Sequence, residues 1–197
     1  MKRAFELLLV ILASPVWLPL MVIVALLTFA FHGRPVLFTQ DRGGLGGRVF
    51  QLYKFRSMTN ARGPDGELLS DERRLTRFGK FLRSSSLDEL PSLLNFFRGD
   101  IALVGPRPFI ADYLNYYSPE QARRHEVRPG ITGWAQVMGR NSLTWDRRLE
   151  LDVWYVDNRS LPLDMKIMLL TILKVLKREG ISEANGVTMS RFRGPGS

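Results

Sequence analysis

The stretch from Ala4 to Phe31, AFELLLVILASPVWLPLMVIVALLTFAF, carries a single charge, Glu6, close to its start. About 20 helical residues, at about 1.5 Å each, span a hydrocarbon core about 30 Å thick, so this stretch is long enough to cross a membrane. Pro15 follows Ser14 near its middle and Pro19 comes one turn later. Each proline ring removes a helical N–H donor and crowds the carbonyl group four residues back. The sequence therefore predicts a helix that breaks at Ser14-Pro15.

Basic residues stand on both sides of this apolar stretch. Lys2 and Arg3 precede it, and the basic residues that follow it are Arg34, Arg42, Arg48, Lys54 and Arg56. The positive-inside bias favours the cytoplasm for both ends. We therefore expect residues 1–33 to form a re-entrant membrane helix. A transmembrane anchor bent at proline is the alternative, since proline is common in spanning helices.

Composition bounds the remaining possibilities. A chain of 197 residues has room for one compact domain plus an appendage. The absence of cysteine excludes disulfide scaffolds, thiolate nucleophiles and cysteine-ligated zinc, and two histidines nearly exclude a histidine-based metal site. The net charge of +9 predicts attraction to nucleic acid, an anionic membrane or phosphate-bearing substrates. Any chemistry must therefore use carboxylates and cations.

The rest of the chain predicts a helix-rich α+β fold with short strands. Residues 36–39 and 49–55 indicate a hairpin, whose glycine-rich connection at 43–47 is read as a flexible turn, with a phosphate-cradling loop as the alternative. Helical spacing is found at 71–82, 91–97, 109–117, 119–125, 145–156 and 162–179. We expect a catalytic domain over 34–190 and a tail at 191–197, whose last four residues resemble an expression-vector remnant.

The last of these helices has an uneven distribution of charge. Residues 163–178 are apolar over most of their circumference, and the basic side chains lie on one stripe: Lys166, Lys174, Lys177 and Arg178. This pattern fits an amphipathic helix at a membrane interface, or a core helix with a solvated lysine edge. The preceding helix carries Trp145, Trp154 and Tyr155, which suit either a lipid-headgroup belt or a buried core.

Polar side chains are densest between residues 83 and 108. Asp88 and Glu89 are adjacent acids. Ser86 and Glu89 have the spacing of a capping box, which makes the acids part of a helix start. If Pro91 is instead the first helical residue, both acids lie in the approach to the helix. Farther along, two prolines restrict the backbone around Arg107, whose planar guanidinium can grip a phosphate.

At this point the chain resembles a known family. Its motifs, in order, are the Ser-Pro break, YKFRSM (53–58), LDELP (87–91), RGD (98–100), VGPRP (104–108) and PGITGW (129–134). Together they resemble the bacterial sugar transferases, in particular the small monotopic phosphoglycosyl transferases, over essentially the whole chain. We expect the minimal form of that family, in which no further membrane region or nucleotide-binding domain precedes the catalytic part.

The resemblance implies transfer of a phosphosugar from a UDP-sugar to a polyprenyl phosphate such as undecaprenyl phosphate, with release of UMP, at the cytoplasmic face of the bacterial inner membrane. It makes Asp88 the nucleophile that carries a covalent phosphosugar. Glu89 then helps to hold Mg2+ or assists proton handling, so that both acids are candidate metal ligands. A carboxylate attacks a diphosphate anion only if charge is neutralised, which requires a divalent metal and fixed cations.

The candidate substrate ligands that follow from this likeness are Lys54, Arg56, Arg83 and Arg107, of which Lys54 and Arg107 rank first. Arg128 and Arg140 are further contacts. Asp152 supports the metal or the nucleotide, or is an ordinary helix-surface carboxylate, and His125 is structural. The expected partners are the UDP-sugar, the polyprenyl phosphate and membrane lipid, without nucleic acid.

Two other functions stay open in the sequence, which indicates neither the sugar nor the oligomeric state. A basic peripheral module that binds lipid or nucleic acid without catalysis fits the charge, although its basic residues are dispersed. An ordinary glycosyltransferase that moves the sugar alone would release UDP, but the chain contains no Asp-x-Asp triplet.

Overall fold

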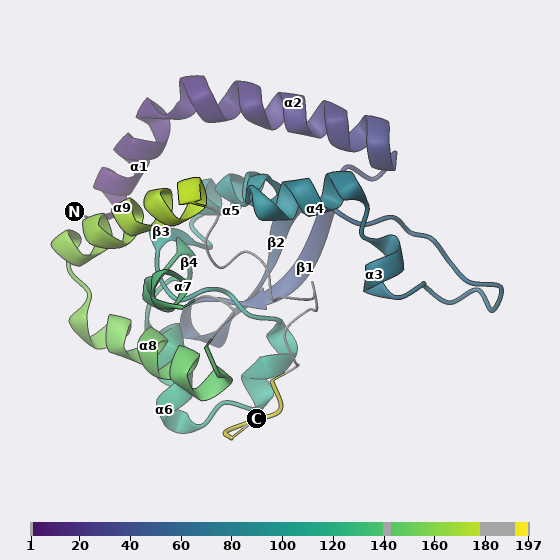
Figure 1. Ribbon diagram of the computed structural model, residues 1–197. Helices are drawn as coiled ribbons and strands as arrows, with labels where there is room; N and C mark the ends of the chain where they lie inside the picture. The colour runs from purple at the N-terminus through teal and green to yellow at the C-terminus, as the bar shows by residue number, and fades with distance from the viewer. Residues whose placement is uncertain (1, 140–142, 178–191, 197) are drawn as a thin grey trace.

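The computed structural model describes residues 2–139, 143–177 and 192–196 (Figure 1). It has the predicted helix-rich α+β character. The helices are α1 (Lys2–Leu12), α2 (Ser14–His32), α3 (Asp71–Arg74), α4 (Arg77–Ser84), α5 (Ser92–Arg98), α6 (Pro119–Ala122), α7 (Trp134–Met138), α8 (Trp145–Asn158) and α9 (Leu161–Lys177). The strands are β1 (Leu37–Gly43), β2 (Val49–Phe55), β3 (Ala102–Val104) and β4 (Gly130–Thr132). The first two pair antiparallel and the last two pair parallel.

The N-terminal apolar stretch is broken where the prolines predict it. α1 ends at Leu12 and α2 begins at Ser14, with Pro15 in its first turn, where the missing N–H costs no hydrogen bond. The indole nitrogen of Trp17 donates to the carbonyl oxygen of Val10 at 2.9 Å, which gives an acceptor at the break a partner. The two helices form an arch over the rest of the molecule (Figure 1).

One side of the arch packs on the protein body and the other is exposed and apolar. Val10 joins a cluster with Phe96, and Val24 joins one with Phe55 and Leu82. The exposed apolar side chains include Leu12, Val16, Val22, Ile23 and Leu26. By length and composition alone, the 19-residue α2 is able to cross a membrane.

Both ends of the arch are tied to the body by polar contacts. The Lys2 ammonium donates to the Val104 carbonyl oxygen at 2.9 Å and pairs with Asp164 at 2.8 Å. At the other end, a His32 ring nitrogen lies 2.8 Å from the carbonyl oxygen of Arg56. One end of the arch therefore contacts the body at β3, and the other contacts it directly after β2.

The β1–β2 hairpin confirms the strand prediction. Its register runs from Leu37 opposite Phe55 to Gly43 opposite Val49. The glycine-rich connection is a turn, as predicted, in which Gly46 and Gly47 adopt positive φ angles of 62° and 74° that glycine accepts without steric cost.

The helix predicted over 71–82 is wrong in one respect, because it is two helices. Leu75 is extended and bridges Met58, which ends α3. Thr76 then caps α4, since its hydroxyl oxygen accepts from the Gly79 N–H at 2.9 Å. A Cβ on Gly79 would stand 1.8 Å from the Ser57 carbonyl oxygen, so only glycine lets α4 approach the end of the hairpin.

The structure confirms three of the remaining predicted helices and contradicts two. α5, α8 and α9 lie where they were expected, although residues 178 and 179 are outside the described part of the chain. Residues 109–117 form only a 3-10 turn at Ala111–Asn115, and 119–125 divides into α6 and a 3-10 turn at Arg123–Glu126. In the first of them, the N–H groups of Tyr113 and Tyr116 bond to carbonyl oxygens three residues back, which is the 3-10 pattern and does not extend into an α-helix.

The C-terminal half packs aromatic side chains inside. Tyr155 belongs to a core cluster of β3 and α7–α9, and Trp145 packs with Phe109 and Tyr113. The headgroup-belt interpretation is therefore wrong for both, whereas Trp154 is 42% exposed and stacks on Trp134. Phe192 of the tail is 2% exposed within the Trp145 cluster.

α9 is neither wholly core nor wholly surface. Ile167 is buried, while Met165, Leu169, Ile172 and Leu173 are exposed. Figure 1 shows α9, α5 and α4 in a row beneath the arch. Apolar side chains are exposed on α5 and α4 as well, at Leu94, Phe97 and Phe81.

His125 has the structural role that the sequence suggested, and it predicts a pH effect. Its Nδ1 donates to the Gly44 carbonyl oxygen at 3.0 Å, and its Nε2 is buried without a hydrogen-bond partner in the described part of the chain. Burial, reinforced by the charge of Arg124, lowers the pKa of His125 to about 4.

The unfolded chain, whose histidine pKa is about 6.5, therefore takes up a proton first as the pH falls, and stability is lost below that value. Between pH 7 and pH 5 we expect His125 to contribute a loss of about 2 kcal/mol. Urea unfolding of the wild type and of His125→Gln, which can still donate to Gly44, isolates this contribution. The same pH dependence in both proteins would contradict it.

Candidate active site

The acid pair lies in a 3-10 turn, Leu87–Glu89, between α4 and α5. Ser86 has a left-handed φ of 58° and its side chain makes no capping hydrogen bond, so the capping-box interpretation is wrong. α5 begins at Ser92, with Pro91 in the capping position, and the Ser92 hydroxyl donates to the Glu89 carbonyl oxygen at 2.6 Å. Both acids thus stand in the approach to the helix, and the sharp turn at Ser86 directs them toward β2.

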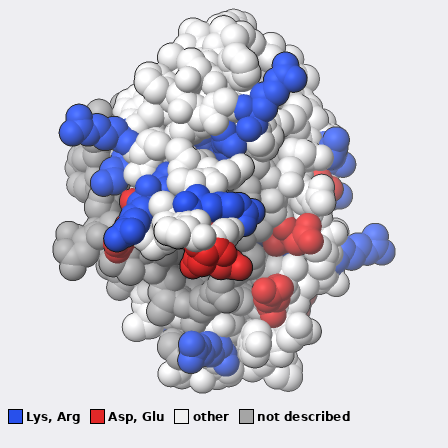
Figure 2. Space-filling view, turned by 90° about the vertical axis from the view of Figure 1, so that its right-hand side faces the viewer, with Lys and Arg blue, Asp and Glu red and all other residues white. Residues whose placement is uncertain are grey.

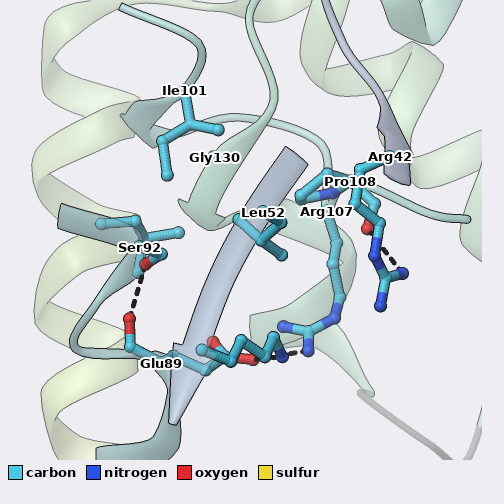
Figure 3. Close-up of a pocket in the computed structure, with 10 residues that line it drawn as sticks. Arg42, Leu52, Glu89, Ser92, Ile101, Arg107, Pro108 and Gly130 are labelled. Carbon is cyan, nitrogen blue, oxygen red and sulfur yellow. Dashed lines mark hydrogen bonds and ion pairs between the residues drawn. The ribbon is translucent and has the colours of Figure 1, made fainter. Parts of the chain in front are cut away.

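Glu89 is clamped between two cations. Its Oε1 accepts from Lys54 Nζ of β2 at 2.7 Å and from Arg107 Nη2 of the Pro106–Pro108 loop at 2.7 Å (Figure 3). Burial alone would raise the pKa of Glu89, but the charges of Arg107 and Lys54 outweigh it and hold the pKa well below its ordinary value. Glu89 is therefore a permanent anion that fixes both cations.

Asp88 is placed differently from its neighbour. Asp88 is 9% exposed, and its carboxylate makes no hydrogen bond or ion pair within the described residues. Burial, and then the charge of Glu89, raise the pKa of Asp88 to about 6, against the opposing charges of Lys54, Arg107 and Arg83. At neutral pH it is a mainly ionised carboxylate without a protein partner, which is the condition of a nucleophile.

The other two arginines predicted near the acids have distinct surroundings. Arg83 of α4 donates from Nε to the Ser57 hydroxyl at 3.0 Å. It lines a surface groove whose other lining residues include Lys54, Asp88, Glu89 and Arg107. Arg56 also lines this groove, but its guanidinium is buried and donates to the carbonyl oxygens of Arg34 at 3.2 Å and Gly33 at 3.1 Å. Arg56 therefore ties the end of the arch to the hairpin.

One predicted residue, Arg128, is not brought to the acid pair. Arg128 is exposed, donates to the Gly99 carbonyl oxygen at 3.0 Å and is not among the described residues that line the groove. Arg140 lies outside the described residues. Nothing in the local sequence around Arg128 reveals which loop it faces.

Asp152 is not the surface carboxylate that its helix pattern allowed. It is 1% exposed and forms an ion pair of 2.8 Å with Arg124, which is 2% exposed. Arg124 Nη2 also donates to the carbonyl oxygen of Arg107 at 2.5 Å, and its guanidinium lies 4.2 Å from the centre of the Phe109 ring. Asp152 thus acts through Arg124 on the backbone of Arg107. Sequence reasoning missed Arg124, which belongs to no recognisable motif.

Asn95 also positions a residue of the site through hydrogen bonds to the backbone. It is fully buried in α5, accepts from the Tyr53 N–H at 3.0 Å and donates to the Gln51 carbonyl oxygen at 2.7 Å. These bonds fix α5 against β2, and hence Glu89 against Lys54.

A further arginine enters the site without a sequence signal. Arg42 of β1 lines a cavity of about 20 Å3 together with Lys54, Glu89 and Arg107 (Figure 3). Its Nη1 donates to the Pro108 carbonyl oxygen at 3.1 Å and its Nη2 to Gln40 Oε1 at 2.5 Å.

The acid pair was also tested as a divalent-metal site. No group of three or more His, Asp or Glu side chains gathers as a metal cage within residues 2–139, 143–177 and 192–196. Mg2+, however, is commonly held by one or two carboxylates together with substrate phosphate oxygens. Among the residues that the structure describes, Asp88 has no competing partner, and both ion pairs of Glu89 use one oxygen, Oε1. This donor set fits a Mg2+ ion completed by a phosphate.

Comparison with known proteins places this site in context. Residues 1–178 match the family model described as "Bacterial sugar transferase". The chain is 58% identical over 164 residues to the sugar transferase EpsL of Bacillus subtilis, covering 83% of this chain and 81% of that protein. It is 41% identical over 185 residues to the UDP-glucose:undecaprenyl-phosphate glucose-1-phosphate transferase of Caulobacter vibrioides, covering 89% and 69%.

A third relative is longer. The undecaprenyl-phosphate galactose phosphotransferase of Salmonella typhimurium is 36% identical over 201 residues, which cover 91% of this chain but 41% of that protein. The family model matches most of the chain, and the alignments to the first two relatives cover more than two thirds of each protein. The chain belongs to the bacterial sugar transferase family.

Proposed function

We propose that this protein transfers a phosphosugar from a UDP-sugar to a polyprenyl phosphate, such as undecaprenyl phosphate, and releases UMP. The observation that carries the proposal is the Asp88 carboxylate, which has no partner among the described residues, beside a Glu89 held by Lys54 and Arg107. The names of two relatives, glucose-1-phosphate and galactose phosphotransferases that act on undecaprenyl phosphate, support the reaction class.

In the first step, an Asp88 oxygen attacks the phosphorus that carries the sugar. A P–O bond forms to Asp88, the bond to the bridging oxygen breaks, and UMP leaves with that oxygen and its electron pair. Lys54 and Arg107 neutralise the phosphate oxygens, because both already point at the carboxylate next to Asp88. Arg83 adds a third positive charge on the Asp88 side.

In the second step, a phosphate oxygen of the polyprenyl phosphate attacks the same phosphorus. The bond to Asp88 breaks, the carboxylate is restored, and the product is a polyprenyl diphosphate sugar. Each step exchanges one P–O bond for another, so the two steps together need no oxidant and no net proton transfer.

We propose Mg2+ as the cofactor, held by Asp88 and Glu89. When bound, it supplies charge neutralisation at the phosphate oxygens. Lys54 and Arg107 remain necessary, since they orient Glu89 and the incoming diphosphate.

We further propose that the arch of α1 and α2 is a re-entrant membrane element on the cytoplasmic face, which makes the protein monotopic. Both ends of the arch contact the body, at Val104 and at Arg56, as a helix pair that enters and leaves one leaflet requires. Figure 2 shows an uncharged top with a band of Lys and Arg below it, an arrangement that suits hydrocarbon above anionic headgroups.

The test of the proposed reaction is UMP release. We expect the full chain, in detergent with Mg2+ and undecaprenyl phosphate, to release UMP from at least one of UDP-glucose, UDP-galactose and UDP-N-acetylgalactosamine. The panel is needed because the relatives are named for these different sugars. Release of UDP in place of UMP would identify a transferase of sugar alone, and no release with any donor would refute the proposal.

A further inference from the structure

Arg42 lines the active site from β1. The strand register places it opposite Phe50, and a bridge to Ile110 holds it beside the Pro106–Pro108 loop. It shares the small cavity with Lys54 and Arg107 (Figure 3). Arg42 also lines the groove that holds Asp88. Its Nη1 contacts the Pro108 carbonyl oxygen, so within this groove Arg42 stands beside the Pro106–Pro108 loop.

Within the described part of the chain, the guanidinium of Arg42 makes hydrogen bonds but no ion pair, and the charge of Glu89 acts on it without direct contact. Its two acceptors are the Pro108 carbonyl and the Gln40 side-chain amide, both of which are neutral. Its Nε is buried without a hydrogen-bond partner in the described part of the chain. Burial, and then the like charge of Arg107, lower the pKa of Arg42 to about 10. A cation held in this way gains from the arrival of an anion.

The charge of the site shows what kind of anion is missing. Four cations surround two carboxylates, and the cations are Lys54, Arg83, Arg107 and Arg42. These cations exceed Asp88 and Glu89 by two positive charges, and a bound Mg2+ would increase this excess. A UDP-sugar carries two phosphates in a row, each with one negative charge. When one phosphorus is at Asp88, the other phosphate must lie one P–O–P link farther along the groove.

We propose that Arg42 binds the uridine-bearing phosphate of the UDP-sugar, which is the phosphate of the leaving UMP. This inference rests on the proposed function and assigns the cation that the leaving group meets. When the P–O bond to the sugar-bearing phosphorus breaks, the electron pair stays on the bridging oxygen and negative charge grows on this phosphate. A fixed guanidinium at that point stabilises the charge as it develops.

The test separates a phosphate contact from a loop-holding role. In Arg42→Gln we expect UMP to bind about 10- to 100-fold more weakly than to the wild type, as befits the loss of one charge-assisted contact. Uridine, which lacks the phosphate, should bind with unchanged affinity. Both affinities are measured as inhibition of UMP release or by calorimetry in detergent. Arg42→Lys keeps the charge but loses the planar fork, so its UMP affinity should lie between those of the wild type and Arg42→Gln.

The matched control is Arg48→Gln, which removes the same charge from an exposed position in the same hairpin. We expect its UMP affinity to equal that of the wild type. If Arg42→Gln weakens UMP and uridine equally, Arg42 only holds the Pro106–Pro108 loop and the inference is overturned. Unchanged UMP binding in Arg42→Gln overturns it as well. Failure of the wild type to release UMP from any donor is a different result, because it refutes the proposed function itself.

Discussion

Asp88→Asn is expected to abolish turnover, with a fall in UMP release of at least about 1,000-fold. The amide has nearly the shape of the carboxylate but cannot form the bond to phosphorus. The cation pair on Glu89 does not involve Asp88, so the substrate-binding groups keep their places. Stability should rise, because burial and the neighbouring Glu89 charge make the ionised Asp88 unfavourable in the folded protein.

Three measurements check this result. UMP release gives the rate, a thermal melt gives the stability, and the intact mass after incubation with a UDP-sugar reports the covalent phosphosugar, which we expect on the wild type alone. Asp41→Asn, at an exposed position in β1, is the matched control and should be fully active. An active Asp88→Asn protein would remove Asp88 from the mechanism.

Asp152→Ala is expected to lower the free energy of unfolding by about 3–5 kcal/mol. The substitution leaves the guanidinium of Arg124 buried without its counter-charge. Because Arg124 also holds the Arg107 carbonyl oxygen, activity should fall along with stability.

Denaturant unfolding in detergent measures the loss, and Asp152→Asn, which keeps the volume, should recover part of it. Glu150→Gln in the same helix is the control: its pair with Arg147 is exposed, so a change of less than about 0.5 kcal/mol is expected. If Asp152→Ala unfolds at the same denaturant concentration as the wild type, the buried pair does not stabilise the fold.

Local signals in the sequence were sufficient for the elements that depend on local physics. Pro15 broke the apolar helix because its ring acts on the turn in which it stands. Apolar runs flanking the glycine cluster were enough for the β1–β2 hairpin. The extended Leu75, by contrast, is held by Met58 across the chain, and no helical periodicity reveals that contact.

The residues of the candidate site also fall into two groups, those that the sequence predicts and those that it does not. Lys54 and Arg107 were predicted from motifs, and they do converge on Glu89. The surroundings of Arg42 and Asp152 are set by tertiary packing: one depends on how β1 passes the Pro106–Pro108 loop, and the other on a 3-10 turn that carries Arg124. Lys54 and Arg107 were found because they belong to family motifs, whereas Arg42 and Arg124 belong to no motif that was recognised and their partners are set by tertiary packing alone.

The single oxygen of Glu89 that receives both Lys54 and Arg107 has a consequence for selectivity. This carboxylate oxygen competes with any anion that approaches the two cations. Because it belongs to the same molecule, its effective concentration at the cations is high. Chloride or orthophosphate must displace it with one small ion. A donor with several anionic oxygens along its length engages additional positive groups at once, so the resting enzyme stays ready for its donor amid a large excess of simple salts.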